Sequence, residues 1–248
     1  MFHQGLADLI QLMGHLIAGF CTIHSIQMPH WTNKLFGGAV NGLGWMSYMM
    51  FLLVIAIERC MHVCKPRMVK ECFSSRNVER WTHLCWLCGF LWFTVYLSPY
   101  VDFVYFTEGY GFYYQFDAPY SQTAKSFGFW LNTAQMITVG FCYSFVLIWA
   151  WKLVDMAAND QIQKSLVKQT ALIFSYTFCL EVYFDVWPHF MPRHKYSTAV
   201  LSVLWILNGA VNPIVYLTLN GQVFFVLRTC MRHVVRYISA QSELKLVR

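Results

Sequence analysis

The sequence predicts an all-α protein that crosses a membrane several times, and two observations carry this prediction. The 248 residues are 57% hydrophobic and only 12% charged, against about 25% charged in an ordinary soluble domain. Long segments without Asp, Glu, Lys or Arg recur, and one of them runs from Tyr196 to Leu227. About 20 apolar residues already span a bilayer as a helix. The chain has too few charges to cover a soluble domain of this length.

Six largely apolar segments are each about long enough to cross the membrane as a helix. They are residues 9–26, 35–57, 81–101, 127–151, 170–187 and 197–219. Residues 1–219 therefore form one helix bundle. In residues 220–248, apolar side chains alternate with Arg228, Arg232 and Arg236, which predicts a short amphipathic helix at the membrane interface and a cytoplasmic tail. Cys230 in that helix is a candidate for palmitoylation, and a basic anchor without acylation is the alternative.

The positions of Lys and Arg predict the orientation, because these residues accumulate in cytoplasmic loops. Of the 18 Lys and Arg residues, only Lys34, Lys125, Arg193 and Lys195 fall on the side opposite the two termini. We therefore expect both termini in the cytoplasm and the loop 102–126 outside. The net charge of +6 comes from basic residues that gather on the side of the two termini. We therefore expect these residues to contact membrane lipid and not nucleic acid.

Nothing in the sequence indicates an enzyme or a metal centre, because no nucleophile–base pair and no metal-ligating motif is present. Cys85 and Cys88 have the spacing of a zinc or redox pair, but the chain offers no second pair, and ordinary packing is the favoured interpretation. His15, His24 and His30 do not share one helix face, so we interpret them as polar packing or interface groups.

Charged and amide side chains within the spans are candidates for functional sites, because burying them in hydrocarbon is costly. They are Asp8 in the first span, Glu58 and Arg59 at the cytoplasmic end of the second, Glu181 and Asp185 in the fifth, and Asn208 and Asn212 in the last. The alternatives are solvated or snorkelling helix ends for the charged pairs and interhelical hydrogen bonds for the two amides. Pro213 predicts a hinge, since proline frees a backbone carbonyl.

The order and spacing of these residues resemble the rhodopsin-like G-protein-coupled receptors. The motifs are Ala7-Asp8-Leu9, Glu58-Arg59-Cys60 and Asn208-Gly209-x-x-Asn212-Pro213-x-x-Tyr216, with Trp86 at about the place of the fourth-helix tryptophan. Ile57-Glu58-Arg59, followed by Lys65-Pro66 and Phe73-Ser74, is similar to the nematode serpentine chemoreceptors of the Srx group. Those receptors have seven helices. The resemblance implies that the first span here corresponds to their second helix, so we expect their first helix to be absent.

The resemblance implies a chemosensory receptor in the plasma membrane, of the kind found in sensory-neuron cilia, which couples an outside small molecule to a heterotrimeric G protein. The implied activation switch consists of Glu58, Arg59, Tyr143, Asn212, Pro213 and Tyr216. In this switch Glu58 holds the forked Arg59 guanidinium in one state. In the other state the tyrosine hydroxyls accept hydrogen bonds from it.

The resemblance also implies a mid-membrane polar cluster of Asp8, Asn208 and Asn212. Such a cluster holds sodium in related receptors, but the third-helix hydroxyl position of the family is Tyr48 here. A protonated Asp8 hydrogen-bonded to the two amides is the alternative. No other cofactor is expected.

The candidate ligand pocket combines aromatic residues of the outer loop with the outer half of the fifth span. It consists of Tyr113, Tyr114, Phe178, Glu181 and Asp185. An aromatic, weakly polar lid suits a small, partly apolar ligand, and the two carboxylates add a counter-charge for a cationic one. The alternative is a loop that folds on itself or lies at the membrane interface. The usual third-helix cysteine of the family falls near Lys34, and the loop has no cysteine to pair with it.

Two other classes of function remain open. A transporter or channel predicts paired broken helices or a charge-lined pathway, and only one span contains a proline interruption. A receptor-like membrane subunit that lacks a helix and does not signal is the second alternative.

Glycosylation acceptors inserted one at a time test the predicted orientation. A site in the loop 102–126 is expected to be modified, and a site in the tail after Leu219 is expected to stay unmodified, because Lys and Arg mark the tail side as cytoplasmic. The reverse pattern of modification would overturn the topology.

Overall fold

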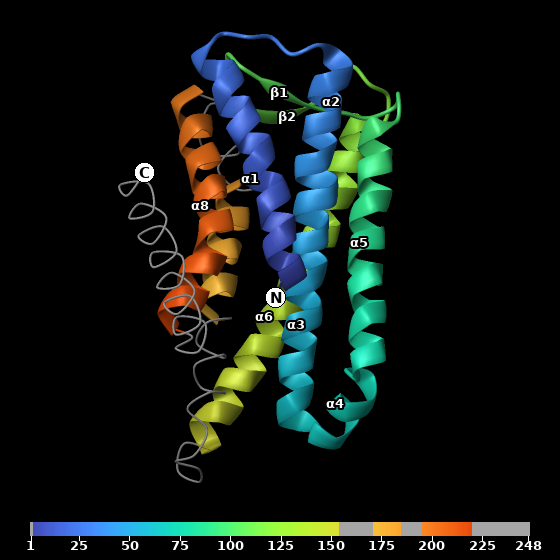
Figure 1. Cartoon of the computed structure of the whole chain (residues 1–248), viewed down its shortest axis with the longest axis vertical. Helices are drawn as coiled ribbons and strands as arrows, with labels where there is room; N and C mark the ends of the chain where they lie inside the picture. Colours follow the sequence, from blue (N-terminus) through green and yellow to red (C-terminus); the bar gives the residue numbers. More distant parts are fainter. Residues whose placement is uncertain (1, 154–170, 185–194, 220–248) are drawn as a thin grey trace, which may run out of the picture.

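The computed structural model describes residues 2–153, 171–184 and 195–219, and it is an elongated helix bundle with a small β-hairpin at one end (Figure 1). Its helices are α1 (Phe2–Ile23), α2 (His30–Gly38), η1 (Ala39–Met46), α3 (Ser47–Cys64), α4 (Pro66–Cys72), α5 (Ser75–Leu97), α6 (Ser121–Leu153), the helix Ala171–Phe184 and α8 (Lys195–Leu219). The predicted helix bundle is confirmed. The predicted amphipathic segment 220–248, with Cys230, lies outside the described residues.

Among the described residues, three helices are long and apolar enough to cross a membrane. They are Phe2–Ile23, the continuous helix His30–Cys64 and Ser121–Trp149. Two shorter apolar helices, Ala171–Phe184 and Tyr196–Val211, accompany them. Many large apolar side chains on the outside of the bundle, such as Leu16, Phe141 and Ile148, are more than half exposed. Because soluble proteins seldom leave so much apolar surface in water, this surface fits contact with lipid.

Helices α2, η1 and α3 form one unbroken helix from the hairpin end of the bundle to the α4 end (Figure 1). The helix begins after Pro29, four or five residues before the predicted start of the second span, and it includes the buried Lys34. Its middle part, η1, is π-helical over eight residues. π-Helical turns are rare and occur frequently at functional sites.

The outer loop contains a β-hairpin that the all-α prediction omits. Strand β1 (Asp102–Phe106) pairs antiparallel with β2 (Gly111–Gln115). Both strands are rich in aromatic residues, which favour strands. Stacking of Phe103 on Phe112, with ring centroids 5.9 Å apart, adds a cross-strand contact.

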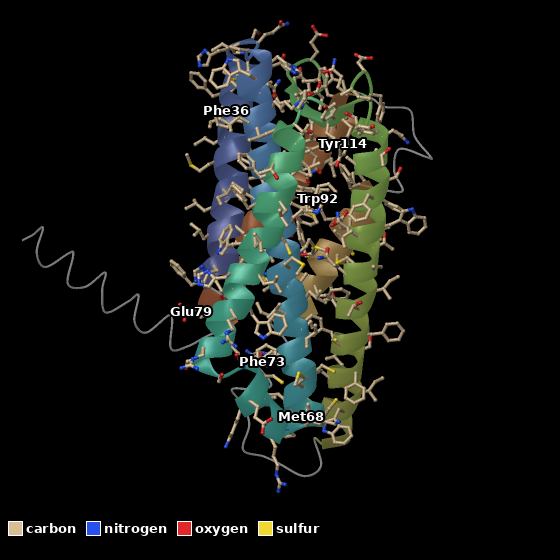
Figure 2. The ribbon with its side chains drawn as sticks, turned by 90° about the vertical axis from the view of Figure 1, so that its right-hand side faces the viewer. Phe36, Met68, Phe73, Glu79, Trp92 and Tyr114 are labelled. Carbon is tan, nitrogen blue, oxygen red and sulfur yellow. The ribbon has the colours of Figure 1, made fainter. Side chains whose placement is uncertain are left out.

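The main core lies midway along the bundle, where η1, α3, α6 and the helix Ala171–Phe184 meet. Trp45, Tyr48, Val139 and Ile173 are all buried there. A second cluster, built on Tyr96 and Phe103, lies at the hairpin end. Figure 2 shows Tyr114 near this end and Met68 at the opposite one, with Trp92 between them.

Gly42 allows η1 and α5 to pack closely. A Cβ at this position would lie 2.6 Å from the Phe93 amide nitrogen and 2.7 Å from its Cα. These are backbone atoms of a helix, so they cannot rotate away. The two helices can therefore keep this separation only with glycine at position 42.

Replacing Gly42 with alanine is expected to lower the thermal unfolding midpoint, since overpacking of this kind costs about 1–3 kcal/mol. The matched control is Gly5→Ala on α1, where a Cβ meets nothing within 4 Å and a helix gains up to about 1 kcal/mol. Equal midpoints for the two purified variants would show that the contact with Phe93 is not restrictive.

Candidate functional site

A cavity of about 410 Å³ lies between the helices at the hairpin end of the bundle. Its walls come from α1, η1, α5, α6, α8 and the helix Ala171–Phe184, and β2 contributes Gly111 to Tyr114. Trp45 of η1 and Trp205 of α8 both line it, with ring centroids 4.6 Å apart. The volume falls in the range of small-molecule sites, which are usually apolar with a few placed polar groups.

Polar contacts with α2 attach the hairpin over this cavity. Lys34 Nζ lies 2.6 Å from Asp102 Oδ1 at the start of β1, and His30 Nε2 lies 3.6 Å from the same oxygen. The Asn33 amide donates to the Tyr105 carbonyl oxygen at 2.7 Å and accepts from the Tyr105 amide at 2.6 Å. Asn33 thus pairs with β1 as the backbone of a neighbouring strand would. Lys34 therefore holds the loop by an ion pair with Asp102.

Contacts with α5 and α8 hold the other strand. The Tyr114 and Tyr96 hydroxyls are 2.7 Å apart, and Asn41 donates to the Tyr96 hydroxyl at 2.8 Å. Tyr113 donates to the Thr198 hydroxyl, and Ser202 donates to the Tyr110 carbonyl oxygen at 2.8 Å.

Burial raises the pKa of two phenols of the hairpin, Tyr114 and Tyr105. Desolvation raises the pKa of Tyr114 to about 12, despite the hydrogen bond with Tyr96 that lowers it. Desolvation also raises the pKa of Tyr105, whose hydroxyl is 2.5 Å from that of Thr22 on α1. Both phenols therefore remain hydrogen-bond donors near neutral pH.

The structure brings together part of the predicted ligand pocket. Tyr113, Tyr114 and Glu181 line the cavity. Phe178 does not line it, and this side chain is 47% exposed on a smaller hollow of about 160 Å³ between α6 and the helix Ala171–Phe184. Glu181, one turn away on the same face of this helix, lines both hollows, whereas Phe178 lines only the smaller one. Asp185 lies outside the described residues.

Sequence reasoning missed His15, which lines the cavity from α1. Its ring packs edge-on against Phe112, with centroids 5.7 Å apart. His15 continues a stripe of polar side chains formed by the buried residues Gln4, Asp8 and Gln11. Their spacing of four, three and four residues places all of them on one helix face. This periodicity was the signal that could have found His15.

Midway along the bundle, a hydrogen-bonded chain joins three helices. The Thr177 hydroxyl is 2.9 Å from the Tyr48 hydroxyl, 2.9 Å from the Ile173 carbonyl oxygen and 3.3 Å from Asn208 Oδ1. Because Thr177 carries one proton, it donates to one of the latter two and accepts from Tyr48. Tyr48, at the hydroxyl position of the family, thus reaches Asn208 through Thr177.

Asp8 is also buried, at 2% exposure, and Gln11 one turn away accepts a hydrogen bond of 3.1 Å from Trp205 Nε1. A direct contact of Asp8 with Asn208 stays a prediction, and the side chain of Asn212 lies outside the described ones. In the described part of the chain, no group of three or more His, Cys, Asp or Glu residues could hold a metal ion. Sodium at Asp8 likewise stays a prediction.

At the α4 end, Glu58 contacts two basic side chains on its own helix. Its Oε2 lies 3.3 Å from Arg59 Nε and its Oε1 lies 3.4 Å from His62 Nε2. Both Glu58 and Arg59 remain about one-fifth exposed. Tyr143 of α6 is buried at 2% exposure, and its ring centroid is 5.7 Å from that of Phe174. The side chains of the other switch residues, Pro213 and Tyr216 among them, lie outside the described part.

Comparison with known proteins gives one family. Residues 3–220 match the family model described as "Serpentine type 7TM GPCR chemoreceptor Srx". The match covers most of the chain and confirms the resemblance of its motifs. No curated protein matches the sequence.

Replacing Lys34 with methionine is expected to loosen the hairpin. The change leaves Asp102 largely buried without its ammonium partner, which we expect to cost about 2 kcal/mol, below the cost for a fully buried pair. The double variant Lys34→Met/Asp102→Asn is expected to recover part of the loss. The unfolding midpoint of each purified protein measures the effect.

The control is Arg76→Met, which removes an exposed cation at the start of α5. If Lys34→Met lowers the midpoint no more than this control does, the ion pair does not hold the hairpin.

Proposed function

Because this chain belongs to the Srx family of serpentine seven-transmembrane chemoreceptors, we propose that it binds a small molecule in the outer cavity and activates a heterotrimeric G protein at the opposite end. The family makes it a membrane protein with a chemoreceptor role. The observation that supports the coupling is the unbroken helix His30–Cys64. This helix lines the cavity with Asn41 and Trp45 and carries the Glu58–Arg59 pair near its other end.

The two ends of this helix are well separated. Trp45 and Arg59 are 14 residues apart, which corresponds to about 21 Å along an α-helix. A ligand acts over this distance only if it binds one of two conformations more tightly than the other. The π-helical segment η1 belongs to the cavity wall, so a ligand there contacts the least regular part of the helix.

In the proposed mechanism the resting state keeps Arg59 beside Glu58, as the 3.3 Å contact supports. In the active state the guanidinium leaves Glu58 and faces the G protein, with the Tyr143 and Tyr216 hydroxyls as its new hydrogen-bond partners. Pro213, next to Asn212, lets the last helix bend during this change.

We propose that the receptor lies in the plasma membrane, like receptors of sensory-neuron cilia, with the hairpin outside the cell and both termini inside. The charge distribution supports this orientation. Lys65, Arg67 and Lys70 cluster in or next to α4, and Lys and Arg mark the cytoplasmic side.

Replacing Arg59 with alanine is expected to abolish stimulated nucleotide exchange while leaving surface level and binding at the outer cavity largely intact, because Arg59 lies far from that cavity. The full chain would be expressed with a heterotrimeric G protein and exposed to a panel of volatile and water-soluble small molecules. Exchange would be measured per receptor at the cell surface.

Arg80→Ala, an exposed arginine of α5 at the same end, is the control and should couple normally. If Arg59→Ala lowers only the surface level, with normal exchange per receptor, Arg59 is a snorkelling anchor and the coupling mechanism is wrong.

A further inference from the structure

Two residues that line the outer cavity each carry a buried polar atom without a hydrogen-bond partner among the described residues. They are His15 Nε2 on α1 and Asn132 Oδ1 on α6. Buried polar groups in proteins are normally hydrogen-bonded, and an exception calls for an explanation. Since both residues line a cavity large enough for a small molecule, a bound molecule can supply both partners.

The other residues that line the cavity indicate the shape and chemical character of that molecule. Trp45, Phe103, Phe112, Phe129 and Trp205 all line the cavity. Aromatic rings favour stacked or edge-on contacts with another ring. The cavity therefore suits a flat, unsaturated molecule of one or two rings better than a flexible polar one.

The charges around the cavity favour a neutral molecule. Among the described residues, its lining contains one carboxylate, Glu181, and one ammonium group, Lys125. Lys125 Nζ already lies 5.6 Å from the centroid of the Phe116 ring, where the ring face attracts a cation. The two side chains carry opposite charges, so the lining has no net charge for an ionic ligand to neutralise.

We infer that the cavity recognises a neutral aromatic molecule that carries a hydrogen-bond donor, held between Asn132 and His15. Asn132 Oδ1 can only accept, so the molecule must donate to it. His15 Nε2 donates or accepts according to its tautomer, so it takes a second polar group or the same one. This inference deepens the proposed function and rests on the outer cavity as the ligand site.

A set of probes of nearly equal shape tests the inference on the purified full chain in lipid nanodiscs. Indole carries an N–H donor and benzofuran replaces it with an oxygen acceptor, while tryptamine and indole-3-acetate add a positive or a negative charge. Each probe is titrated, and the unfolding midpoint is followed through exposure of the buried thiols Cys21 and Cys85 to a thiol-reactive dye.

Indole is expected to raise the midpoint and to bind about tenfold more tightly than benzofuran, the factor expected for one hydrogen bond to a buried acceptor. Asn132→Leu should remove this difference, weakening indole about tenfold and leaving benzofuran within about twofold. His15→Phe should weaken indole in the same direction. The controls His24→Phe, just after α1, and Thr138→Val on α6 change exposed residues outside the cavity and should keep the difference.

Equal binding of indole and benzofuran, or an Asn132→Leu variant that still distinguishes them, would overturn the donor requirement. Preferred binding of tryptamine would show that Glu181 selects a cation, and preferred binding of indole-3-acetate would show that Lys125 selects an anion. Either result contradicts the proposal that the ligand is a neutral aromatic molecule. The absence of any shift in the unfolding midpoint contradicts it too. Unbound midpoints of the variants identify those that fail to fold.

The proposed coupling mechanism and the proposed ligand class can be contradicted independently of each other. Probe binding with normal exchange by Arg59→Ala contradicts the coupling mechanism and leaves the ligand class standing. Stimulated exchange that requires Arg59, together with no binding of any probe, contradicts the ligand class and leaves the coupling standing.

Discussion

Polar groups buried between helices in a membrane must find their partners inside the bundle, because hydrocarbon offers none. The described part of this chain meets that constraint with contacts that each join separate helices. Trp205 of α8 donates to Gln11 of α1, and Thr177 links Tyr48 of α3 to Asn208 of α8. These contacts fix how the helices face one another. The outer cavity lies beside them, where His15 and Asn132 have no such partner within the described residues.

The hairpin completes the cavity through reversible contacts. Contacts of Lys34 with Asp102, and of Asn33 with Tyr105, join α2 to β1. Ion pairs and hydrogen bonds need no oxidising compartment, whereas a disulfide does. They also break and form again quickly, so the cover of the cavity can respond to a ligand without any covalent step.

One helix connects this cover to the α4 end of the bundle. Its first part binds the hairpin, η1 lines the cavity, and its last part carries Glu58 and Arg59. Gly42 lets α5 approach η1 so closely that a Cβ at this position would overlap the Phe93 backbone.

The sequence by itself determined the class of protein, the family and the helices, because long uncharged segments and motif spacing are properties of one stretch of chain. The sequence also allowed contacts between neighbouring residues of one helix to be predicted, such as that of Glu58 with Arg59. Only the tertiary structure decided that Lys34 pairs with Asp102, 68 residues away, that Phe178 leaves the cavity, and that His15 shares it with Asn132. Such pairs depend on how each helix is rotated and crossed against its neighbours, and packing between helices sets that rotation.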